Sequence, residues 1–364
     1  MSPEFHLLLL SIRLTDREQI NGEAIRIIND YKIDWDFLYR LAADHSVRPQ
    51  LAKLMNSLPS GLLPEELIQR LENEYQTNLY DQLSNASEFI KVYNILKNSG
   101  IRIVPFKGFW LGYEMYENIA DREASDVDVF VDFNDILRLR EIMLKNGYVI
   151  EEQMKHYSVD DLIRKSGEYN FDKIQSGRSV FHIEFHWRIS SPVYGLNINI
   201  KDLENNISTG KLDANEINVF DKTANLLLAI LHHAGKDPLD SLKNVLDIAL
   251  IIKKDPNIDW DWLLSKAKKL KSENLVYISV KIASELTGID IPGRINTRCN
   301  LSRISRLASN RIRFMEKSLT YWHPWIFIND WLFRIRSRSG FRTKLRLTVY
   351  ISRVLIKRFF RISA

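Results

Sequence analysis

The sequence contains a single cysteine, Cys299, among its 364 residues. An intrachain disulfide and a metal cluster held by several thiolates are therefore excluded, and this composition favours the reducing cytosol. Long hydrophobic runs are missing too, because no stretch of about 18 uncharged apolar residues occurs. The run from Leu7 to Leu10 is too short for the core of a signal peptide and lacks a small-residue cleavage site. We expect a cytoplasmic protein that is neither secreted nor membrane-spanning.

Glycine and proline are also scarce, with 14 and 10 residues, so no low-complexity segment is indicated. The hydrophobic content of 45% and the charged content of 27% are typical of a folded globular protein. A chain of this length predicts two or three domains. The sequence has no Ser-His-Asp, HExxH, Walker or GxGxxG signature, which disfavours hydrolase, protease and dehydrogenase functions.

Acidic residues are nearly missing from the last part of the chain. Residues 301–364 hold 15 lysines and arginines against two acids, Glu316 and Asp330. Since the whole chain has a net charge of +5, this segment carries +13 and residues 1–300 carry −8. A separation of this size indicates that the tail meets an anionic partner or packs on the acidic part of its own chain.

The hydrophobic pattern predicts an α+β protein with three regions. Residues 1–98 have apolar positions at three- and four-residue intervals, which predicts a helical N-terminal region. Residues 99–200 contain short β-branched and alternating segments, which predict a compact α/β core with a mixed sheet. Residues 201–364 predict a helical C-terminal region with a basic amphipathic tail at about 341–364. Helix breaks are expected at Asn21-Gly22, 59–64 and 98–100.

Three segments of the predicted core have the pattern of strands. Ile101 to Phe106 is short and β-branched, as in a buried strand that runs into a loop. Asp126 to Asp132 reads D-V-D-V-F-V-D, and Val180 to Arg188 reads V-F-H-I-E-F-H-W-R. Because strand side chains alternate between two faces, each of the last two strands sends its carboxylates to one face. Further elements are expected in the core: a helix from about Phe109, a helix at 134–146, and a strand pair at 148–152 and 169–174.

Asp126 and Asp128 are the first candidates for chemistry. They lie one residue apart on a predicted strand, so both carboxylates project to the same side, a spacing that suits a hard cation such as Mg²⁺ or Mn²⁺. The alternative for an isolated pair of this kind is a solvated sheet edge. Glu184 lies on a later predicted strand, on the same face as His182 and His186. It supplies a third carboxylate beside Asp126 and Asp128, so the two aspartates are not an isolated pair.

These motifs together resemble the uncharacterised nucleotidyltransferase family that is often encoded near bacterial exopolysaccharide and capsule genes. The resemblance rests on F-K-G-F-W-L-x-x-x-M-Y at 106–116, S-D-V-D-V-F-V at 125–131 and H-I-E-F-H-W at 182–187. It extends from Asp44-His45-Ser46-Val47 to Leu246-Asp247-Ile248 and covers about residues 30–255. It implies a nucleotidyltransferase-like core and transfer of a nucleoside monophosphate (NMP) group from an NTP to a hydroxyl group of an unknown small-molecule, glycan-precursor or protein acceptor.

The resemblance also implies roles for individual residues. Asp126 and Asp128 would bind a pair of Mg²⁺ or Mn²⁺ ions, and Glu184 would complete the catalytic triad of acids and help to activate the acceptor hydroxyl. This agrees with general chemistry, since carboxylates that bridge two metals stabilise the attacking and leaving oxygens of an in-line displacement. The NTP would be bound by the loop that follows the first strand and by residues before the acid pair: Lys107, Gly108, Arg122 and Ser125.

Two features depart from the wider superfamily. The residue after Gly108 is Phe109 rather than a small hydroxyl residue, and the distance of 18 residues from Gly108 to Asp126 is longer than usual. The alternative is therefore a nucleotide-binding regulatory or scaffold protein of a surface-polysaccharide system with little or no catalysis.

Several other polar residues have both a functional and a structural interpretation. His182 and His186 either contact the substrate or satisfy a local polar need on their strand. His232, His233 and Lys236 lie near the end of an amphipathic helix that either closes over the nucleotide or packs on the core. Asp247 interrupts an apolar run, so it predicts a buried acid that requires an Arg or Lys partner from the α/β core.

The tail has a basic arc at the helical period, formed by Arg342, Arg346, Arg353, Lys357 and Arg361, with mostly apolar residues elsewhere. Packing against the body is one interpretation of this helix. The other is contact with an anionic surface, either a membrane at the inner face of the cell or, with less support, nucleic acid.

Overall fold

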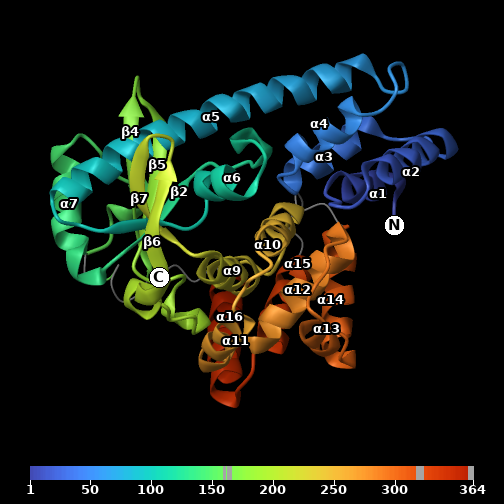
Figure 1. Ribbon diagram of the computed structural model, residues 1–364. Coiled ribbons are helices and arrows are strands. Elements are labelled where there is room, and N and C mark those ends of the chain that lie inside the picture. The colour runs from blue at the N-terminus through green and yellow to red at the C-terminus, as the bar shows by residue number, and fades with distance from the viewer. Residues whose placement is uncertain (159–160, 162–165, 317–323, 360–364) are drawn as a thin grey trace.

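The computed structural model describes residues 1–158, 161, 166–316 and 324–359. These residues form many helices, one five-stranded mixed sheet and one two-stranded hairpin, which confirms the predicted α+β class. The sheet lies on one side of the molecule, and the N-terminal and C-terminal helices lie on the other (Figure 1). The long helix α5 (Glu65–Asn98) runs across the top and connects the N-terminal helices to the sheet.

The N-terminal helices begin at polar capping residues. Asp16 accepts a hydrogen bond from the backbone N–H of Gln19, and Asp34 accepts one from Phe37. The break expected at Asn21-Gly22 was wrong, because α2 continues through it and buries Ile20 and the apolar residues of the next two turns. The four helices before α5 are α1 (Pro3–Ser11), α2 (Arg17–Asp30), α3 (Trp35–Asp44) and α4 (Arg48–Asn56).

The central sheet has the strand order β1-β2-β5-β4-β3. Strands β2 and β5 run parallel, whereas the β1/β2, β4/β5 and β3/β4 pairs are antiparallel. The alternating segments predicted as strands are therefore neighbours in the middle of a mixed sheet. The strands are β1 (Ile103–Pro105), β2 (Val127–Val131), β3 (Val149–Ile150), β4 (Glu168–Gln175) and β5 (Arg178–His186).

The two faces of this sheet have different surroundings. One face packs on α5 and α7 (Ile136–Lys145) and forms an apolar cluster that includes Val129 and Ile183. On the other face, Phe130 joins the larger core that contains the C-terminal helices. Because side chains alternate along a strand, Asp128 lies on the same face as Phe130 and points toward the C-terminal helices. Between β1 and β2 the chain forms α6 (Phe109–Met115) and the short helix η1 (Ile119–Asp121).

A hairpin of β6 (Ile207–Leu212) and β7 (Asn215–Phe220) follows the central sheet. This hairpin is an unexpected element, because the sequence predicts a helical region at residues 201–364. Its second strand contacts β1, and Tyr93 of α5 accepts a hydrogen bond from the backbone N–H of Asn218 at 2.9 Å. The hairpin therefore belongs to the sheet side of the molecule.

The described residues after the hairpin are mainly helical, and their core is continuous with that of the N-terminal helices. No helix in the described part of the chain combines the length and apolar content needed to cross a bilayer. The elements are α9 (Lys222–Ile230), the π-helical turn η6 (Leu231–Lys236), α10 (Leu242–Lys254), α11 (Trp260–Lys269), α12 (Glu273–Thr287), α13 (Gly293–Cys299), α14 (Ser302–Met315), α15 (Pro324–Ser337) and α16 (Phe341–Phe359).

The basic tail forms α16, which docks on the body through Leu347 and Ile351. These residues pack against Trp331 of α15. The predicted interpretation of packing against the body is therefore observed for this face of the helix. Arg361 of the predicted basic arc lies outside the described residues, as does the side chain of Lys357.

Candidate functional site

Acidic side chains cluster where β2 and β5 run side by side. The parallel register places Asp128 opposite Glu184, so the two carboxylates share one face of the sheet. Asp128 is fully buried, whereas the Glu184 side chain is 16% exposed. His186, two residues further along β5, is fully buried, and its Nε2 lies 2.9 Å from Asp128 Oδ1 and 3.2 Å from Glu184 Oε2. The structure thus brings these three predicted residues into one cluster.

Lys107 and Asp126 lie beside this cluster. Asp126 directly precedes β2, and its side chain is 30% exposed. The Lys107 ammonium lies 2.6 Å from Asp128 Oδ1 and 3.7 Å from Asp126 Oδ2. It compensates the charge of two carboxylates that would otherwise repel each other, which is also what a bound metal cation does.

Cationic side chains keep Glu184 ionised. Burial alone would raise the pKa of Glu184, but hydrogen bonds from His182 and His186 and the charge of Lys107 hold it well below its usual range. The hydrogen bond to Glu184 raises the pKa of His182 to about 9. Burial alone would lower the pKa of His186, but its bonds to Asp128 and Glu184 raise it to about 9. Both imidazoles therefore carry a proton at neutral pH.

The loop before α6 requires glycine at position 108. Gly108 has a φ of 62°, and a Cβ there would collide with the backbone carbonyl oxygen of Asp126. Glycine therefore lets this loop lie directly against the start of β2. Phe109 is fully buried and packs on Phe89 of α5, with ring centroids 5.1 Å apart. The residue after the glycine is thus part of the core, which explains why no hydroxyl group stands there.

Arg122 is buried, and its donors are used within the protein. Its Nε and Nη2 donate to the two carboxylate oxygens of Asp247 at 2.9 and 2.8 Å, and its Nη1 donates to the Gly108 carbonyl oxygen at 2.9 Å. The partner predicted for a buried Asp247 is therefore confirmed. A phosphate contact by Arg122, as the resemblance implies, would require this ion pair to open, so the geometry favours a role in holding the loop. Ser125 is exposed beside Asp126.

The other two histidines differ in their surroundings. His182 is partly exposed on β5, and its Nδ1 lies 2.9 Å from Asp172 Oδ1 while its Nε2 lies 3.6 Å from Glu184 Oε1. His232 is buried on η6, and burial lowers its pKa well below the ordinary value, with a further contribution from the charge of Lys107. Both predicted substrate contacts therefore lie in the surroundings of the acid cluster, but only His182 touches one of its carboxylates.

One residue of the site, Glu168, was not predicted from the sequence. Glu168 begins β4 opposite His186, and its Oε2 lies 3.3 Å from His186 Nδ1. Lys236, at the end of η6, has its ammonium 3.5 Å from Glu168 Oε2. The pattern of β4 showed a strand, but only the antiparallel register with β5 places Glu168 next to the histidine.

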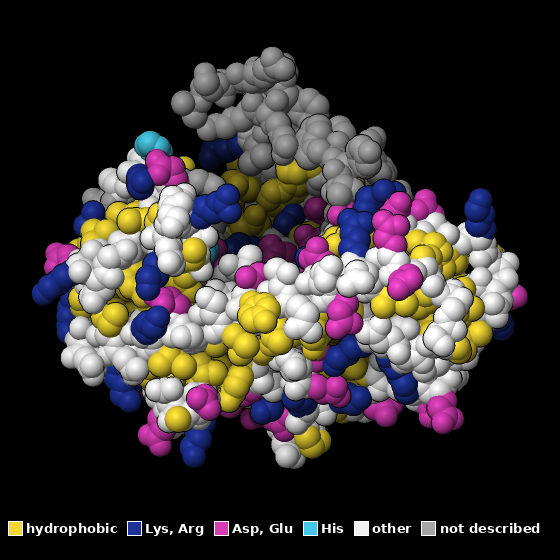
Figure 2. All heavy atoms as spheres, turned by 90° about the horizontal axis from the view of Figure 1, so that it is seen from above, with side chains coloured by type: hydrophobic (Ala, Val, Ile, Leu, Met, Phe, Trp, Pro, Cys, Tyr) yellow, Lys and Arg dark blue, Asp and Glu magenta, His cyan; other side chains and the backbone are white. Residues whose placement is uncertain are grey.

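A pocket of about 480 Å³ adjoins Glu184. Asn170 lines it, donates to Glu151 Oε2 at 2.9 Å, and has a buried Oδ1 without a hydrogen-bond partner among the described residues. The face seen from above is hollowed and has acidic and basic side chains at the floor of the hollow (Figure 2). The pocket lining combines acids, aromatic rings, hydroxyl groups and one lysine: Glu151, Tyr157, Ser166, Glu168, Asn170, Glu184, Tyr194 and Lys236.

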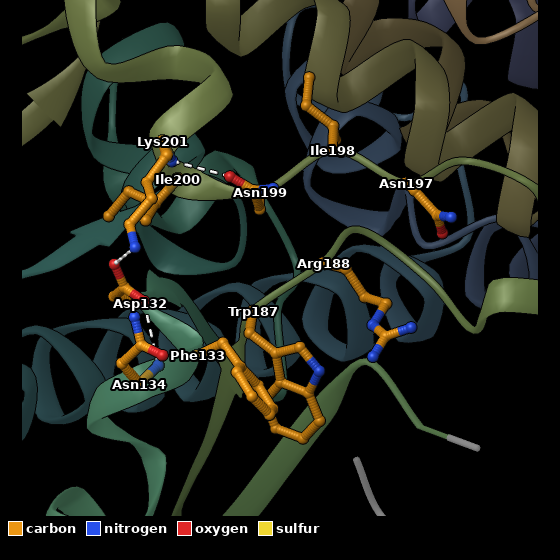
Figure 3. Close-up of a pocket in the computed structure, with 10 residues that line it drawn as sticks. All are labelled: Asp132, Phe133, Asn134, Trp187, Arg188, Asn197, Ile198, Asn199, Ile200 and Lys201. Atoms are coloured by element: carbon orange, nitrogen blue, oxygen red, sulfur yellow. Dashed lines mark hydrogen bonds and ion pairs between the residues drawn. The ribbon is translucent and has the colours of Figure 1, made fainter. Parts of the chain in front are cut away.

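A second pocket, of about 470 Å³, lies at the carboxyl ends of β2 and β5 (Figure 3). Phe133 and Trp187 form one wall in an edge-to-face contact with ring centroids 6.0 Å apart. On another side, Lys201 pairs with Asp132 at 2.9 Å. Asp132 lies six residues after Asp126, or roughly 20 Å along an extended strand. Glu184 lines the first pocket, whereas none of the three acids lines this one.

The carboxylates of the cluster fit a cation. One carboxylate oxygen of Asp128 and one of Glu184 lie within 4.8 Å of each other, which is a spacing that one ion could bridge. Asp128 Oδ2 is buried and has no hydrogen-bond partner in the described part of the chain. An unpartnered buried carboxylate oxygen is costly unless a cation or water satisfies it.

Comparison with known proteins agrees with the geometry. The family model described as "Uncharacterised nucleotidyltransferase" matches residues 31–288, which is more than two thirds of the chain. No curated protein matches the sequence. The matched segment includes β1, β2, β5, η6 and α10, and so contains every residue of the acid cluster.

Proposed function

The chain belongs to the uncharacterised nucleotidyltransferase family, and from this premise we propose that it transfers an NMP group from an NTP to a hydroxyl group of an acceptor. The acceptor oxygen attacks the α-phosphorus, and the bond from that phosphorus to the bridging oxygen of pyrophosphate breaks. Pyrophosphate leaves, and the acceptor proton passes to a nearby base or to solvent. The acceptor is a small molecule, a glycan precursor or a protein, in keeping with the resemblance to proteins encoded near exopolysaccharide genes.

One observation carries this proposal. Asp128 and Glu184 are direct register partners on parallel strands, with Asp126 at the open end of the first strand. Two carboxylates thereby meet on one face of the sheet, and Lys107 lies between Asp128 and the Asp126 carboxylate where the glycine loop meets the strand. Structural ion pairs alone would not require Asp126 to remain partly exposed, or Asp128 to keep a buried oxygen without a partner in the described residues.

We propose that Asp126, Asp128 and Glu184 hold divalent cations, Mg²⁺ or Mn²⁺. Such ions supply charge stabilisation to the attacking and leaving oxygens of the phosphoryl group when bound. Glu184 stays ionised beside His182 and His186, as a ligand must, and it faces the pocket where the acceptor hydroxyl would lie. Lys107 would exchange its contact with Asp128 for the triphosphate once a cation neutralises the acids.

We assign the acceptor to the pocket beside Glu184. Its volume of about 480 Å³ suits a small molecule, and its tyrosines, amide and carboxylates suit a ligand rich in hydroxyl groups. Asn170 Oδ1 and the Glu151 carboxylate are hydrogen-bond acceptors in this lining. The NTP would then approach from the side of Lys107, Gly108 and Ser125.

The cellular place of the reaction is also a proposal. The single cysteine favours the cytoplasm, and α16 carries exposed arginines that suit the anionic inner face of a membrane. Nucleic acid is the weaker alternative, because the sequence contains no recognised RNA-binding module.

The experiment has two stages. Calorimetry with each of the four NTPs in the presence of Mg²⁺ or Mn²⁺ identifies the nucleotide, and mass spectrometry then detects NMP transferred to candidate sugars, glycan precursors or cell proteins. Asp126→Asn is expected to abolish metal-supported NTP binding without loss of fold. Asp132→Asn is the matched control, because this acid follows the same strand and pairs with Lys201 away from the cluster.

The outcomes separate the two candidate functions. NTP binding that disappears in the Asp126→Asn/Asp128→Asn variant, together with transferred NMP, supports the enzyme. Metal-dependent NTP binding without transfer to any acceptor supports the nucleotide-binding regulatory or scaffold protein. Equal binding by the wild type and the double variant rules out the acid cluster as the site.

A further inference from the structure

A second group of potential ligands lies on the π-helical turn η6. His232 and His233 are adjacent on this turn, and Asp237 follows it directly. One ligand atom from each of the three residues lies within 4.8 Å of the others. Both histidines are buried, at 5% and 3% exposure, whereas the Asp237 side chain is 37% exposed and opens the group to solvent. None of the three belongs to the acid cluster on β2 and β5.

The imidazoles have nitrogen atoms that the protein does not satisfy. Both ring nitrogens of His232 and the Nδ1 of His233 are buried and have no hydrogen-bond partner among the described residues. Buried polar atoms are nearly always partnered, by protein, water or an ion. Three unpartnered nitrogens on two neighbouring rings therefore point to a ligand at this position.

The distance between the His232 and Asp237 side chains matches two ligands of one ion better than a hydrogen bond. His232 Nδ1 lies 3.2 Å from Asp237 Oδ2, yet the pair does not meet hydrogen-bond geometry. Ligand atoms on a tetrahedral zinc ion, with bonds of about 2.0–2.2 Å, lie about 3.3 Å from each other. The backbone keeps the aspartate there, because the N–H of Asp237 donates to the His232 carbonyl oxygen at 2.8 Å.

The outer contacts of His233 are also those of a metal ligand. Its Nε2 lies 3.0 Å from Asp247 Oδ2, and since a carboxylate only accepts, Nε2 carries the proton and Nδ1 has a free lone pair. Histidine ligands of metals commonly donate their second nitrogen to a carboxylate in this way. Asp247 is itself fixed by Arg122 and by the hydroxyl of Tyr116, which donates at 2.7 Å.

We propose that His232, His233 and Asp237 bind a transition-metal ion of the zinc class. Two imidazoles with one carboxylate select such ions over Mg²⁺, which prefers oxygen ligands. Three protein ligands leave one tetrahedral position for water or a substrate oxygen. The two neighbouring ammonium groups lie beside acids, Lys107 beside Asp128 and Lys236 beside Glu168, which reduces their repulsion of a bound ion.

The test uses the tag-free, full-length protein after treatment with chelator. Titration with Co²⁺ is expected to give a visible absorption band of tetrahedral coordination at one equivalent, and excess Mg²⁺ should leave it unchanged. His232→Gln and Asp237→Asn nearly keep the size of the side chain but remove a metal ligand. Loss of a residue that only hydrogen-bonds a ligand weakens metal binding about 10–100-fold, and these two variants should weaken Co²⁺ binding by more than that. His156→Gln, on an exposed histidine, is the matched control.

This proposal does not rest on the proposed transfer reaction, and variants of the two sites test them separately. Asp126→Asn/Asp128→Asn should retain the cobalt band even if NTP binding is lost or was never present. Circular dichroism verifies that each variant is folded. Absence of a band in the wild type, or wild-type Co²⁺ affinity in folded Asp237→Asn and His232→Gln, overturns the proposal.

Discussion

Arg122 and Asp247 form a buried ion pair with two hydrogen bonds, of 2.9 and 2.8 Å, between the segment before β2 and helix α10. Burial alone would raise the pKa of Asp247, but Arg122 and His233 hold it well below its ordinary value. The third donor of Arg122 binds the carbonyl oxygen of Gly108. One ion pair therefore joins the C-terminal helices, the turn η6 and the glycine loop beside the acids.

Replacement of Asp247 should destabilise the whole protein. Asp247→Ala leaves the Arg122 guanidinium buried without its partner, and such a change typically costs about 3–5 kcal/mol of the free energy of unfolding. Denaturant unfolding measures this loss. The double variant Arg122→Leu/Asp247→Leu removes both charges and should lose less stability than the two single replacements added together. Additive losses would show that the two residues act separately.

Gly108→Ala tests whether the loop positions Asp126. The added Cβ would meet the Asp126 carbonyl oxygen at a φ that disfavours alanine, so either the loop or the start of β2 must shift. Metal-supported NTP binding, measured by calorimetry, should fall at least tenfold. Gly147→Ala is the matched control for backbone strain, because Gly147 also has a positive φ, of 83°, but has no atom close to a Cβ. Unchanged NTP affinity in Gly108→Ala would contradict the positioning role.

Phe109→Ser restores the hydroxyl that the wider superfamily has after its glycine. We expect it to destabilise the protein instead of improving NTP binding, because Phe109 is fully buried against Phe89. Removal of a buried phenyl ring costs about 3–5 kcal/mol in unfolding experiments. A stable Phe109→Ser variant that binds NTP more tightly would show that the side chain can face the phosphates.

The sheet was predictable because its central strands have a strong pattern. Apolar and polar residues alternate through β2 and β5, and this alternation also assigns Asp128, Glu184 and His186 to one face. What the pattern does not contain is the register between strands. Only the register places Asp128 opposite Glu184 and brings Glu168 next to His186.

Local signals misled the prediction in two places. The hairpin β6/β7 turns at Asp213-Ala214, which lacks the usual Asn-Gly or Asp-Gly pair, although Asp213 adopts a φ of 52°. At Asn21-Gly22 the turn signal is present, but the buried face of α2 outweighs the roughly 1 kcal/mol that glycine costs in a helix. A phosphate contact by Arg122 stays a prediction, and the sequence predicted a basic partner for Asp247 without identifying it as Arg122.

Protonation of His45 in the unfolded chain should lower the free energy of unfolding in mild acid. Its Nε2 lies 2.8 Å from the Met315 carbonyl oxygen, and its Nδ1 accepts from the backbone N–H of Leu242, so the neutral ring is fully satisfied. Burial lowers its pKa to about 4 from the ordinary 6.5; the hydrogen bond to Met315 and the charge of Asp44 act in the opposite direction, and the charge of Arg311 lowers the pKa further. Since the unfolded chain binds the proton more readily, this stability is complete above about pH 6.5 and declines as pH falls toward about pH 4.

The loss from His45 amounts to about 2 kcal/mol between about pH 7.5 and about pH 5. Denaturant unfolding of the wild type and of His45→Gln at both pH values measures it. The variant removes this titration but keeps all others, so the difference in stability between the two proteins should shrink by that amount at the lower pH. An unchanged difference would mean that His45 accepts a proton in the folded protein.

Helix α16 has three distinct faces: a buried apolar face, an exposed apolar stripe and a basic arc. The broad apolar face expected from the sequence therefore consists of two parts, one buried and one exposed. Leu347 and Ile351 are buried against the body. Phe341, Leu345 and Val349 recur every four residues and are exposed by 79%, 50% and 43%. The basic arc of Arg342, Arg346 and Arg353 is exposed and, at 100° per residue, lies beside this second apolar stripe. An apolar stripe next to a basic one is typical of helices that lie in a membrane interface.

Neutralising the basic arc should therefore release the protein from anionic vesicles and leave the fold intact. Each arginine near such a surface is worth about 1 kcal/mol, so the triple change Arg342→Gln, Arg346→Gln and Arg353→Gln should weaken partitioning roughly 100-fold. Flotation with vesicles of phosphatidylglycerol and phosphatidylcholine measures this, at low and high salt.

Deleting 341–364 is a poorer test, because it also uncovers Trp331. The control removes equal charge from exposed residues of other helices, Lys268, Lys269 and Arg298. If the wild type does not float with anionic vesicles, or floats equally with neutral ones, α16 serves only to pack against the body.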